Sequence, residues 1–136
     1  MTGGPARFGG RDDVVLVVVL DCADLGRAAE FWCGALGYTA DPASPGPYRR
    51  LLPPGRNGVE LLLQQVPEPK TAKNRMHLDL RVPDLEAEVA RLVALGGRRV
   101  TDEPIKEEGW AWHVLTDPDG NEFCVLRPPP GRLTES

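Results

Sequence analysis

The stretch Arg75–Val82, with the sequence RMHLDLRV, alternates strictly between apolar and polar or charged residues. Because successive side chains of a β-strand point to opposite faces of its sheet, this stretch predicts a strand with one face against a core. The other face carries an imidazole, a carboxylate and a guanidinium in one row, from His77, Asp79 and Arg81. If the sheet curves, we expect these three groups to line a cavity with a polar floor.

A similar pattern occurs 60 residues earlier, where Val17–Asp24 aligns with His77–Asp84. In each copy a strand-like run leads to an Asp-Leu pair, which is typical of a helix N-terminus, and the helical pattern that follows ends at Leu-Gly. About three strand-like runs follow each helix. The sequence therefore predicts an α+β fold of two tandem βαβββ units, with helices on one face of a curved mixed sheet and a cleft on the other.

The expected elements can be placed along the chain from periodicity and turn residues. Strands are expected over 14–20, 38–40, 48–52, 59–66, 75–82, 98–101, 110–115 and 122–126. Helices are expected to begin at Asp24 and Asp84 and to end at Gly37 and Gly96. We interpret 103–109 as a charged turn and 117–120 as a β-turn. The expected organisation is a flexible arm (1–12), one domain (13–127, with repeat halves of about 13–66 and 75–127) and a tail (128–136).

Composition excludes several classes of function. The 136 residues carry a net charge of −4 without a long basic run, which argues against nucleic acid as a partner. The longest apolar run, Val14–Leu20, has seven residues, whereas about 20 are needed to span a bilayer. Three cysteines at scattered spacing, with no export signal before them, predict free thiols and a cytoplasmic protein.

Three segments together resemble one known family: Asp24–Tyr38 (DLGRAAEFWCGALGY), His77–Leu80 (HLDL) and Asp117–Glu122 (DPDGNE). Their order and spacing are similar to those of the vicinal oxygen chelate superfamily, also called the glyoxalase/bleomycin resistance protein/dioxygenase family. The resemblance covers roughly residues 14–127 and is strongest to small glyoxalase-like proteins. It implies a small organic molecule as the ligand, in a cleft between the sheets, and a homodimer.

The resemblance also implies a divalent metal held by four positions, one from the first and one from the last strand of each half. Carried over, these positions fall on Val17, Leu62, His77 and Cys124. Valine and leucine have no lone pair, so one imidazole and one thiol remain, where a metal site normally has three or four protein donors. We therefore predict no metal and no cofactor.

The predicted binding residues are His77, Asp79 and Arg81 on the floor of the cleft, with Trp112 and Cys124 on its walls. The competing interpretation is that Asp79 pairs with Arg81 on a wet surface. Trp110 and Trp112 share one face of a strand and could stack on a flat ligand or pack in the core. His113 points the opposite way, which favours a core or surface histidine.

Three functions remain open on the sequence. The first is a metal-free glyoxalase-like protein that binds a small organic ligand. The second is a metal-dependent lyase or dioxygenase of the same superfamily, whose ligands lie at other positions. The third is a non-catalytic module that binds a partner protein, for which we expect a closed cavity and an exposed apolar patch elsewhere.

Overall fold

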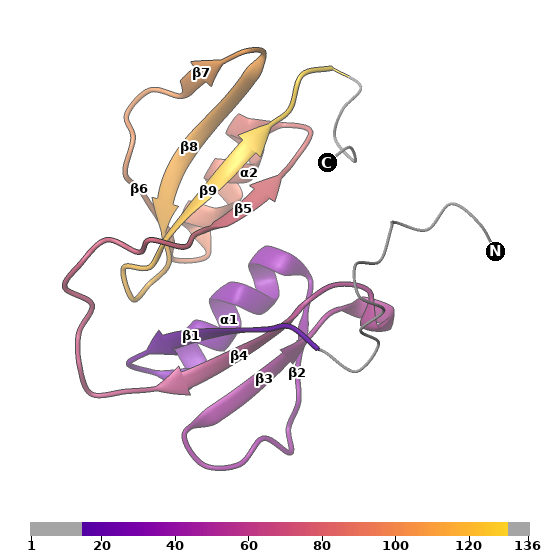
Figure 1. Ribbon diagram of the computed structural model, residues 1–136, viewed down its shortest axis with the longest axis vertical. Helices are drawn as coiled ribbons and strands as arrows, with labels where there is room; N and C mark the ends of the chain where they lie inside the picture. Colours follow the sequence, from indigo (N-terminus) through magenta and orange to yellow (C-terminus); the bar gives the residue numbers. More distant parts are fainter. Residues whose placement is uncertain (1–14, 131–136) are drawn as a thin grey trace, which may run out of the picture.

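The computed structural model describes residues 15–130, which form two similar halves (Figure 1). The first half contains β1 (Val17–Cys22), α1 (Leu25–Leu36), β2 (Thr39–Ala40), β3 (Tyr48–Leu52), a 3₁₀ turn (Pro54–Arg56) and β4 (Glu60–Gln65). The second contains β5 (Leu78–Arg81), α2 (Leu85–Ala94), β6 (Arg98–Arg99), β7 (Ile105–Glu107), β8 (Trp110–Thr116) and β9 (Glu122–Arg127). No helix in the described part of the chain has the length and apolar character needed to cross a membrane.

Each half builds its own mixed sheet. The first sheet has the order β1-β4-β3-β2, and the second has the order β5-β9-β8-β6, with β7 also paired to β8. In both sheets the strand before the helix runs parallel to the last strand of the half, and the remaining pairs are antiparallel. The predicted α+β fold of two βαβββ-like units is confirmed.

Both helices begin where the sequence predicts, and α1 ends at the predicted Gly37, whereas α2 ends at Ala94 with Leu95 as its C-cap, just before the predicted Gly96. The Asp24 carboxylate accepts a hydrogen bond from the Arg27 backbone N–H at 2.9 Å, and the Asp84 carboxylate accepts one from Ala87 at 3.1 Å. At the end of α1, Gly37 takes a φ of 72°, which glycine adopts without the steric cost that a side chain imposes. These caps satisfy backbone groups that a helix terminus otherwise leaves without partners.

Two predictions of local structure need correction. The segment 103–109 is not only a turn, because Ile105–Glu107 forms β7 and pairs with β8. Glu108 and Gly109 both have positive φ, 51° and 88°, which makes the two-residue hairpin turn that follows the twist of the strands. The first strand runs over Val17–Cys22 instead of 14–20, and residue 14 and the predicted arm lie outside the described residues.

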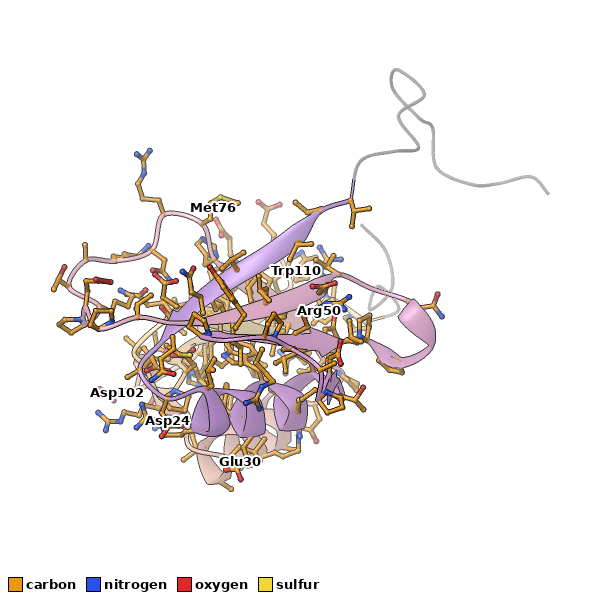
Figure 2. The ribbon with its side chains drawn as sticks, turned by 90° about the horizontal axis from the view of Figure 1, so that it is seen from below. Asp24, Glu30, Arg50, Met76, Asp102 and Trp110 are labelled. Carbon is orange, nitrogen blue, oxygen red and sulfur yellow. The ribbon has the colours of Figure 1, made fainter. Side chains whose placement is uncertain are left out.

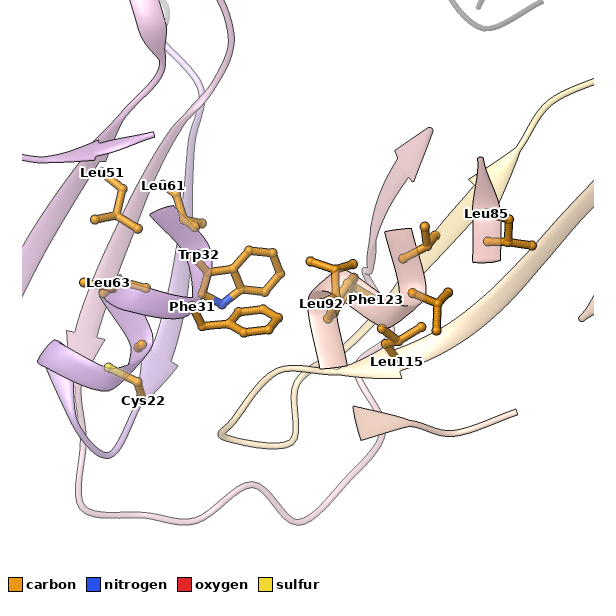
Figure 3. Close-up of a cluster of buried hydrophobic side chains, with 14 of the residues drawn as sticks. Cys22, Phe31, Trp32, Leu51, Leu61, Leu63, Leu85, Leu92, Leu115 and Phe123 are labelled. Atoms are coloured by element: carbon orange, nitrogen blue, oxygen red, sulfur yellow. The ribbon is translucent and has the colours of Figure 1, made fainter. Parts of the chain in front are cut away.

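The two halves share one hydrophobic core. Figure 3 shows Phe31 and Trp32 of α1 pointing toward Leu92 of α2 and Phe123 of β9. The Trp32 and Phe123 ring centroids lie 5.1 Å apart at an interplanar angle of 60°, an edge-on arrangement that aromatic pairs favour. Close packing also fixes Gly97, where a Cβ would lie 3.0 Å from the Leu92 carbonyl oxygen and 3.1 Å from the Phe31 ring.

The helices lie on one side of the sheets and leave the opposite faces open (Figure 2). On β8, Ala111, His113 and Leu115 are buried toward the helices, while Trp110 and Trp112 are only partly buried on the opposite face. The alternation predicted for 75–82 holds only over β5, where Leu78 and Leu80 pack against the core and Asp79 and Arg81 are exposed. The prediction is wrong for Met76, which lies before the strand and is 90% exposed. The open faces are therefore where a ligand can reach the sheets.

Candidate ligand-binding cleft

The row of polar residues on the central strand lies on the open face of the second sheet. Asp79 of β5 is the register partner of Cys124 of the parallel strand β9, and His77 lies just before β5 begins. One potential ligand atom from each of these three side chains lies within 4.8 Å of the other two. His77 and Asp79 are about half exposed, at 47% and 48%, so the group is open to solvent.

Asp79 contacts His77 and Cys124. The His77 Nδ1 lies 3.5 Å from the Asp79 Oδ1, and the Cys124 sulfur lies within 4.8 Å of a candidate ligand atom of each. Burial raises the pKa of the Cys124 thiol, and the negative charge of Asp79 raises it further, while Lys73 acts in the opposite direction. The thiol is therefore a protonated, neutral group when the site is empty at pH 7. The pairing of Asp79 with Arg81 that the sequence left open is not the contact that the structure gives Asp79.

The Arg81 side chain of β5 extends over an aromatic ring of β8 in the same sheet. Its guanidinium carbon lies 5.0 Å from the centroid of the Trp110 ring, within the range of a cation–π contact. Trp112 lies two residues along β8 on the same partly buried face. Arg81 and the two tryptophans thus form a flat, cationic surface beside the trio of His77, Asp79 and Cys124.

His113 lies in the core beneath α2, as its position in β8 predicts. It is 1% exposed, and its Nδ1 lies 2.7 Å from the Thr101 hydroxyl oxygen. The Thr101 oxygen also accepts the Val114 backbone N–H at 3.1 Å. His113 therefore has a structural role in the described chain and is not part of the cleft.

A cavity of about 550 Å³ runs along the open edge of β1, the segment 74–78 and the start of β9. Of the five predicted binding residues, His77 alone lines it within the described part of the chain. Its walls include Val17 and Val19 of β1, together with Met76, which is 90% exposed. The resemblance placed Val17 at a ligand position, but the sequence did not indicate the other two wall residues. Val19 lies in a continuous apolar run that is typical of a fully buried strand, and the alternation around Met76 predicted that it faces the core.

Glu122 holds the connection between the two halves at one end of this cavity. It accepts a hydrogen bond from the Asn74 backbone N–H at 3.1 Å and forms an ion pair with Lys70 at 3.0 Å. Although burial alone raises the pKa of Glu122, the Asn74 N–H and the Lys70 ammonium outweigh it, so that its pKa lies below the ordinary value. The carboxylate is therefore charged and fixes the loop that carries Asn74 toward the cavity.

Comparison with known proteins assigns the family. A family model described as the glyoxalase-like domain matches residues 17–126. The chain belongs to the glyoxalase-like domain family. This confirms the resemblance to the glyoxalase/bleomycin resistance/dioxygenase superfamily. A comparison with curated proteins finds no match.

Solved structures share the fold of this glyoxalase-like protein at low sequence identity. A hypothetical protein from S. aureus is 20% identical, with a TM-score of 0.66, 86% of this chain covered and 99% of the other. A glyoxalase/bleomycin resistance protein/dioxygenase family enzyme from Burkholderia phytofirmans is 17% identical, with a TM-score of 0.66 and coverages of 82% and 95%. A mutant of the fosfomycin resistance protein FosX from Listeria monocytogenes, in complex with Mn(II) and 1S,2S-dihydroxypropylphosphonic acid, is 12% identical, with a TM-score of 0.70 and coverages of 92% and 98%.

The four metal positions implied by the resemblance do not fit an ion held between the halves of this glyoxalase-like domain. Val17 and Leu62 offer only hydrocarbon, which leaves His77 and Cys124 as donors. Glu60 is two residues before Leu62 on the same face of β4, but Arg50 binds both of its carboxylate oxygens at 3.1 Å. Both first-half positions of the implied site therefore lack a donor, and the adjacent carboxylate is already engaged by a guanidinium.

Proposed function

We propose that this glyoxalase-like protein binds a small organic molecule in the cleft on the open side of its sheets without a catalytic metal, since the first half supplies no donor for an ion between the two halves. The observation that carries the proposal is the cavity of about 550 Å³ beside the polar row of the central strand. Its volume lies within the range of about 300–1,000 Å³ that is usual for ligand pockets. FosX, which has the same fold, is described with an organic phosphonate bound.

The lining indicates the chemistry of the ligand. Val17, Val19 and Met76 provide an apolar wall, and His77 and Asn74 provide polar groups at its side. An apolar body bound against β1 would place a polar substituent near His77. The surface formed by Arg81, Trp110 and Trp112 lies on the open face of the same sheet as His77 and suits a flat or anionic extension of the ligand.

The competing function is a metal-dependent lyase or dioxygenase of the same superfamily. The Mn(II) in the FosX complex favours a metal in this fold. The loss of both first-half donors, at Val17 and Leu62, counts against an ion held between the halves of this chain, because only two of the four positions implied by the superfamily then carry a donor. The partner-binding module predicts a closed cavity, whereas Leu16, Val19 and Met76 of the cavity wall are exposed, so this cavity is open to solvent.

We also propose that the protein is a cytoplasmic homodimer. Leu16, Val19 and Met76 are 72%, 49% and 90% exposed, and a second copy of the chain would cover part of this apolar surface. The three free cysteines are compatible with a reducing compartment. Sedimentation equilibrium tests the assembly: a single species with the mass of one chain would rule out the dimer.

A matched pair of variants tests the ligand site. We expect Val19→Trp to fill the cavity and to weaken binding of a hit from a thermal-shift screen of aromatic and carboxylated metabolites by tenfold or more. Val100→Trp is the control, because Val100 is 56% exposed and does not line the cavity. Equal binding by both variants, measured by isothermal titration calorimetry, would refute the proposed site.

A further inference from the structure

We propose that His77, Asp79 and Cys124 bind one soft divalent cation of the zinc class, held entirely within the second sheet. The inference deepens the proposed function, on which it rests, because the ion would lie beside the proposed ligand cavity, which His77 lines. The sequence prediction of no metal counted only the two donors that the family resemblance supplies. The structure adds Asp79, which is outside those four positions, and needs no donor from the first half.

The register of the second sheet brings the three donors together. Asp79 and Cys124 are paired residues on the parallel strands β5 and β9, so their side chains lie next to each other on the open face. His77 is two residues before Asp79 and faces the same side. In the described part of the chain, this is the one group of three histidine, cysteine or acidic side chains whose candidate ligand atoms all lie within 4.8 Å.

One of the distances already suits a metal ion. Two nitrogen or oxygen ligands at 2.0–2.2 Å from a tetrahedral zinc ion are about 3.4 Å apart. His77 Nδ1 and Asp79 Oδ1 are 3.5 Å apart, longer than a hydrogen bond and close to that separation. The ion would therefore require little movement of these two side chains, and the sulfur of Cys124 would complete a triangle of donors.

The types of donor select the class of ion. A set of imidazole nitrogen, carboxylate oxygen and thiolate sulfur suits zinc and its chemical analogues better than magnesium or calcium, which prefer oxygen. On binding, the Cys124 thiol releases its proton to the solvent, and the metal takes the place of that proton on the sulfur. Three protein donors leave a fourth coordination position, which faces the cleft.

The same trio could instead be read as a nucleophilic cysteine with a histidine and an aspartate. In that arrangement the thiol pairs with the imidazole, and its pKa is lowered. Here the register partner of Cys124 is Asp79, so a carboxylate lies beside the thiol instead of an imidazole that could activate it. The contacts therefore favour a metal site over covalent catalysis.

Cobalt(II) spectroscopy tests the inference on the full, untagged chain after removal of bound metals with EDTA. We expect one Co²⁺ per chain, a thiolate-to-cobalt charge-transfer band in the near ultraviolet and visible bands of tetrahedral cobalt, all displaced by Zn²⁺. Cys124→Ser should abolish the charge-transfer band, and Asp79→Asn should weaken Zn²⁺ binding by tenfold or more. Cys33→Ser is the matched control, since Cys33 is a partly buried thiol of α1 outside the trio.

The outcomes separate this inference from the proposed function. If wild-type protein gives no charge-transfer band, or if Cys124→Ser keeps it, the metal site is refuted. Circular dichroism and melting temperature show whether each variant is folded. Binding of an aromatic carboxylate such as salicylate, measured in EDTA, would keep the organic ligand site even when the metal inference fails. A cobalt spectrum without binding of any organic probe would support the metal site and refute the ligand proposal.

Discussion

The indole Nε1 of Trp32 donates a hydrogen bond of 3.0 Å to the Asp117 Oδ2 inside the shared core, where both residues are almost fully buried. Trp32 belongs to α1 of the first half, and Asp117 begins the turn between β8 and β9 of the second. The other carboxylate oxygen of Asp117 accepts the backbone N–H groups of Asp119 and Asn121, each at 2.9 Å. One buried carboxylate therefore shapes the turn and joins the two halves.

Removing either partner of this contact should destabilise the domain. We expect Asp117→Asn to lower the free energy of unfolding by about 2–3 kcal/mol, because an amide cannot accept all the donors that surround the buried carboxylate. Trp32→Phe keeps an aromatic ring in the core but removes one of the two donors to the buried Asp117 Oδ2, which then retains only Asn121 Nδ2, so we expect a loss of about 1–2 kcal/mol. Urea denaturation followed by circular dichroism measures both.

The exposed residue Asp102 provides the control for these variants. Asp102→Asn should leave the urea midpoint within the error of the wild type, since surface substitutions usually change stability by less than about 0.5 kcal/mol. If Asp117→Asn is as stable as Asp102→Asn, the carboxylate does not hold the halves together.

The turn at residues 117–120 could be predicted from the local sequence, whereas the role of Asp117 in joining the two halves could not. The motif of residues 117–120 predicts a β-turn, because proline and glycine fix the backbone locally. The role of Asp117 depends on Trp32, which is 85 residues away in the chain, so no local pattern indicates it. The helix caps at Asp24 and Asp84 were predictable for the opposite reason, since each carboxylate binds a backbone N–H three residues later.

The candidate site likewise has features that the sequence predicts and features that it does not. Strand alternation predicts that His77, Asp79 and Arg81 share a face, because it follows from the period of two alone. It does not predict that Asp79 contacts Cys124, since that contact depends on the register of β5 against β9. The apolar cavity wall along β1 was also missed, because whether the edge of a strand is covered is decided by the rest of the fold.

Arg91 should contribute to the contact between the two helices. From α2 it donates hydrogen bonds to the backbone oxygens of Gly34 at 2.8 Å and Ala35 at 3.1 Å, which lie in the last turn of α1. Lysine has one donor group where arginine has a fork, so Arg91→Lys should lose one or both bonds. Because the side chain is 45% exposed, we expect a loss of only about 1 kcal/mol in the free energy of unfolding, measured by urea denaturation.

Arg98→Lys is the matched control, because Arg98 is an exposed residue of the short strand β6. It should leave the urea midpoint unchanged. An equal midpoint for Arg91→Lys and Arg98→Lys would mean that the hydrogen bonds to α1 add nothing to stability.

The buried thiol of Cys22 should make the fold less stable in alkali. Burial, reinforced by the charges of Asp119 and Asp117, raises its pKa from 9.0 to about 11. The unfolded chain then loses the thiol proton more readily than the folded chain, so stability is full below pH 9 and is lost as the pH rises from 9 to 11. We expect the wild type to lose about 2 kcal/mol more over this range than Cys22→Ala, whose side chain cannot ionise.

Comparing the wild type with Cys22→Ala isolates the ionisation of the Cys22 thiol, because the lysines, tyrosines and other two thiols are present in both proteins. Urea midpoints at half-unit steps of pH give the two stability curves. Cys22→Ala should start lower at neutral pH, since it leaves space in the core, and the curves should converge as the pH rises. Parallel curves would show that the folded and unfolded thiols ionise alike.

Arg81 should act on ligand binding rather than on stability. Its guanidinium lies over Trp110 at the open face of the second sheet, where it can pair with a carboxylate or phosphate group of the ligand. We expect Arg81→Ala to weaken binding of an anionic ligand by about tenfold, equivalent to about 1.4 kcal/mol, while changing the melting temperature little. The affinity of Arg81→Lys should fall between those of the wild type and Arg81→Ala, because lysine keeps the charge and loses the planar contact with the ring.

Arg99→Ala is the control, because Arg99 is an exposed residue of β6, and this variant should bind the ligand as the wild type does. A large fall in melting temperature with unchanged affinity, from calorimetric titration and thermal melts of the same samples, would instead make Arg81 a structural residue that holds the Trp110 ring.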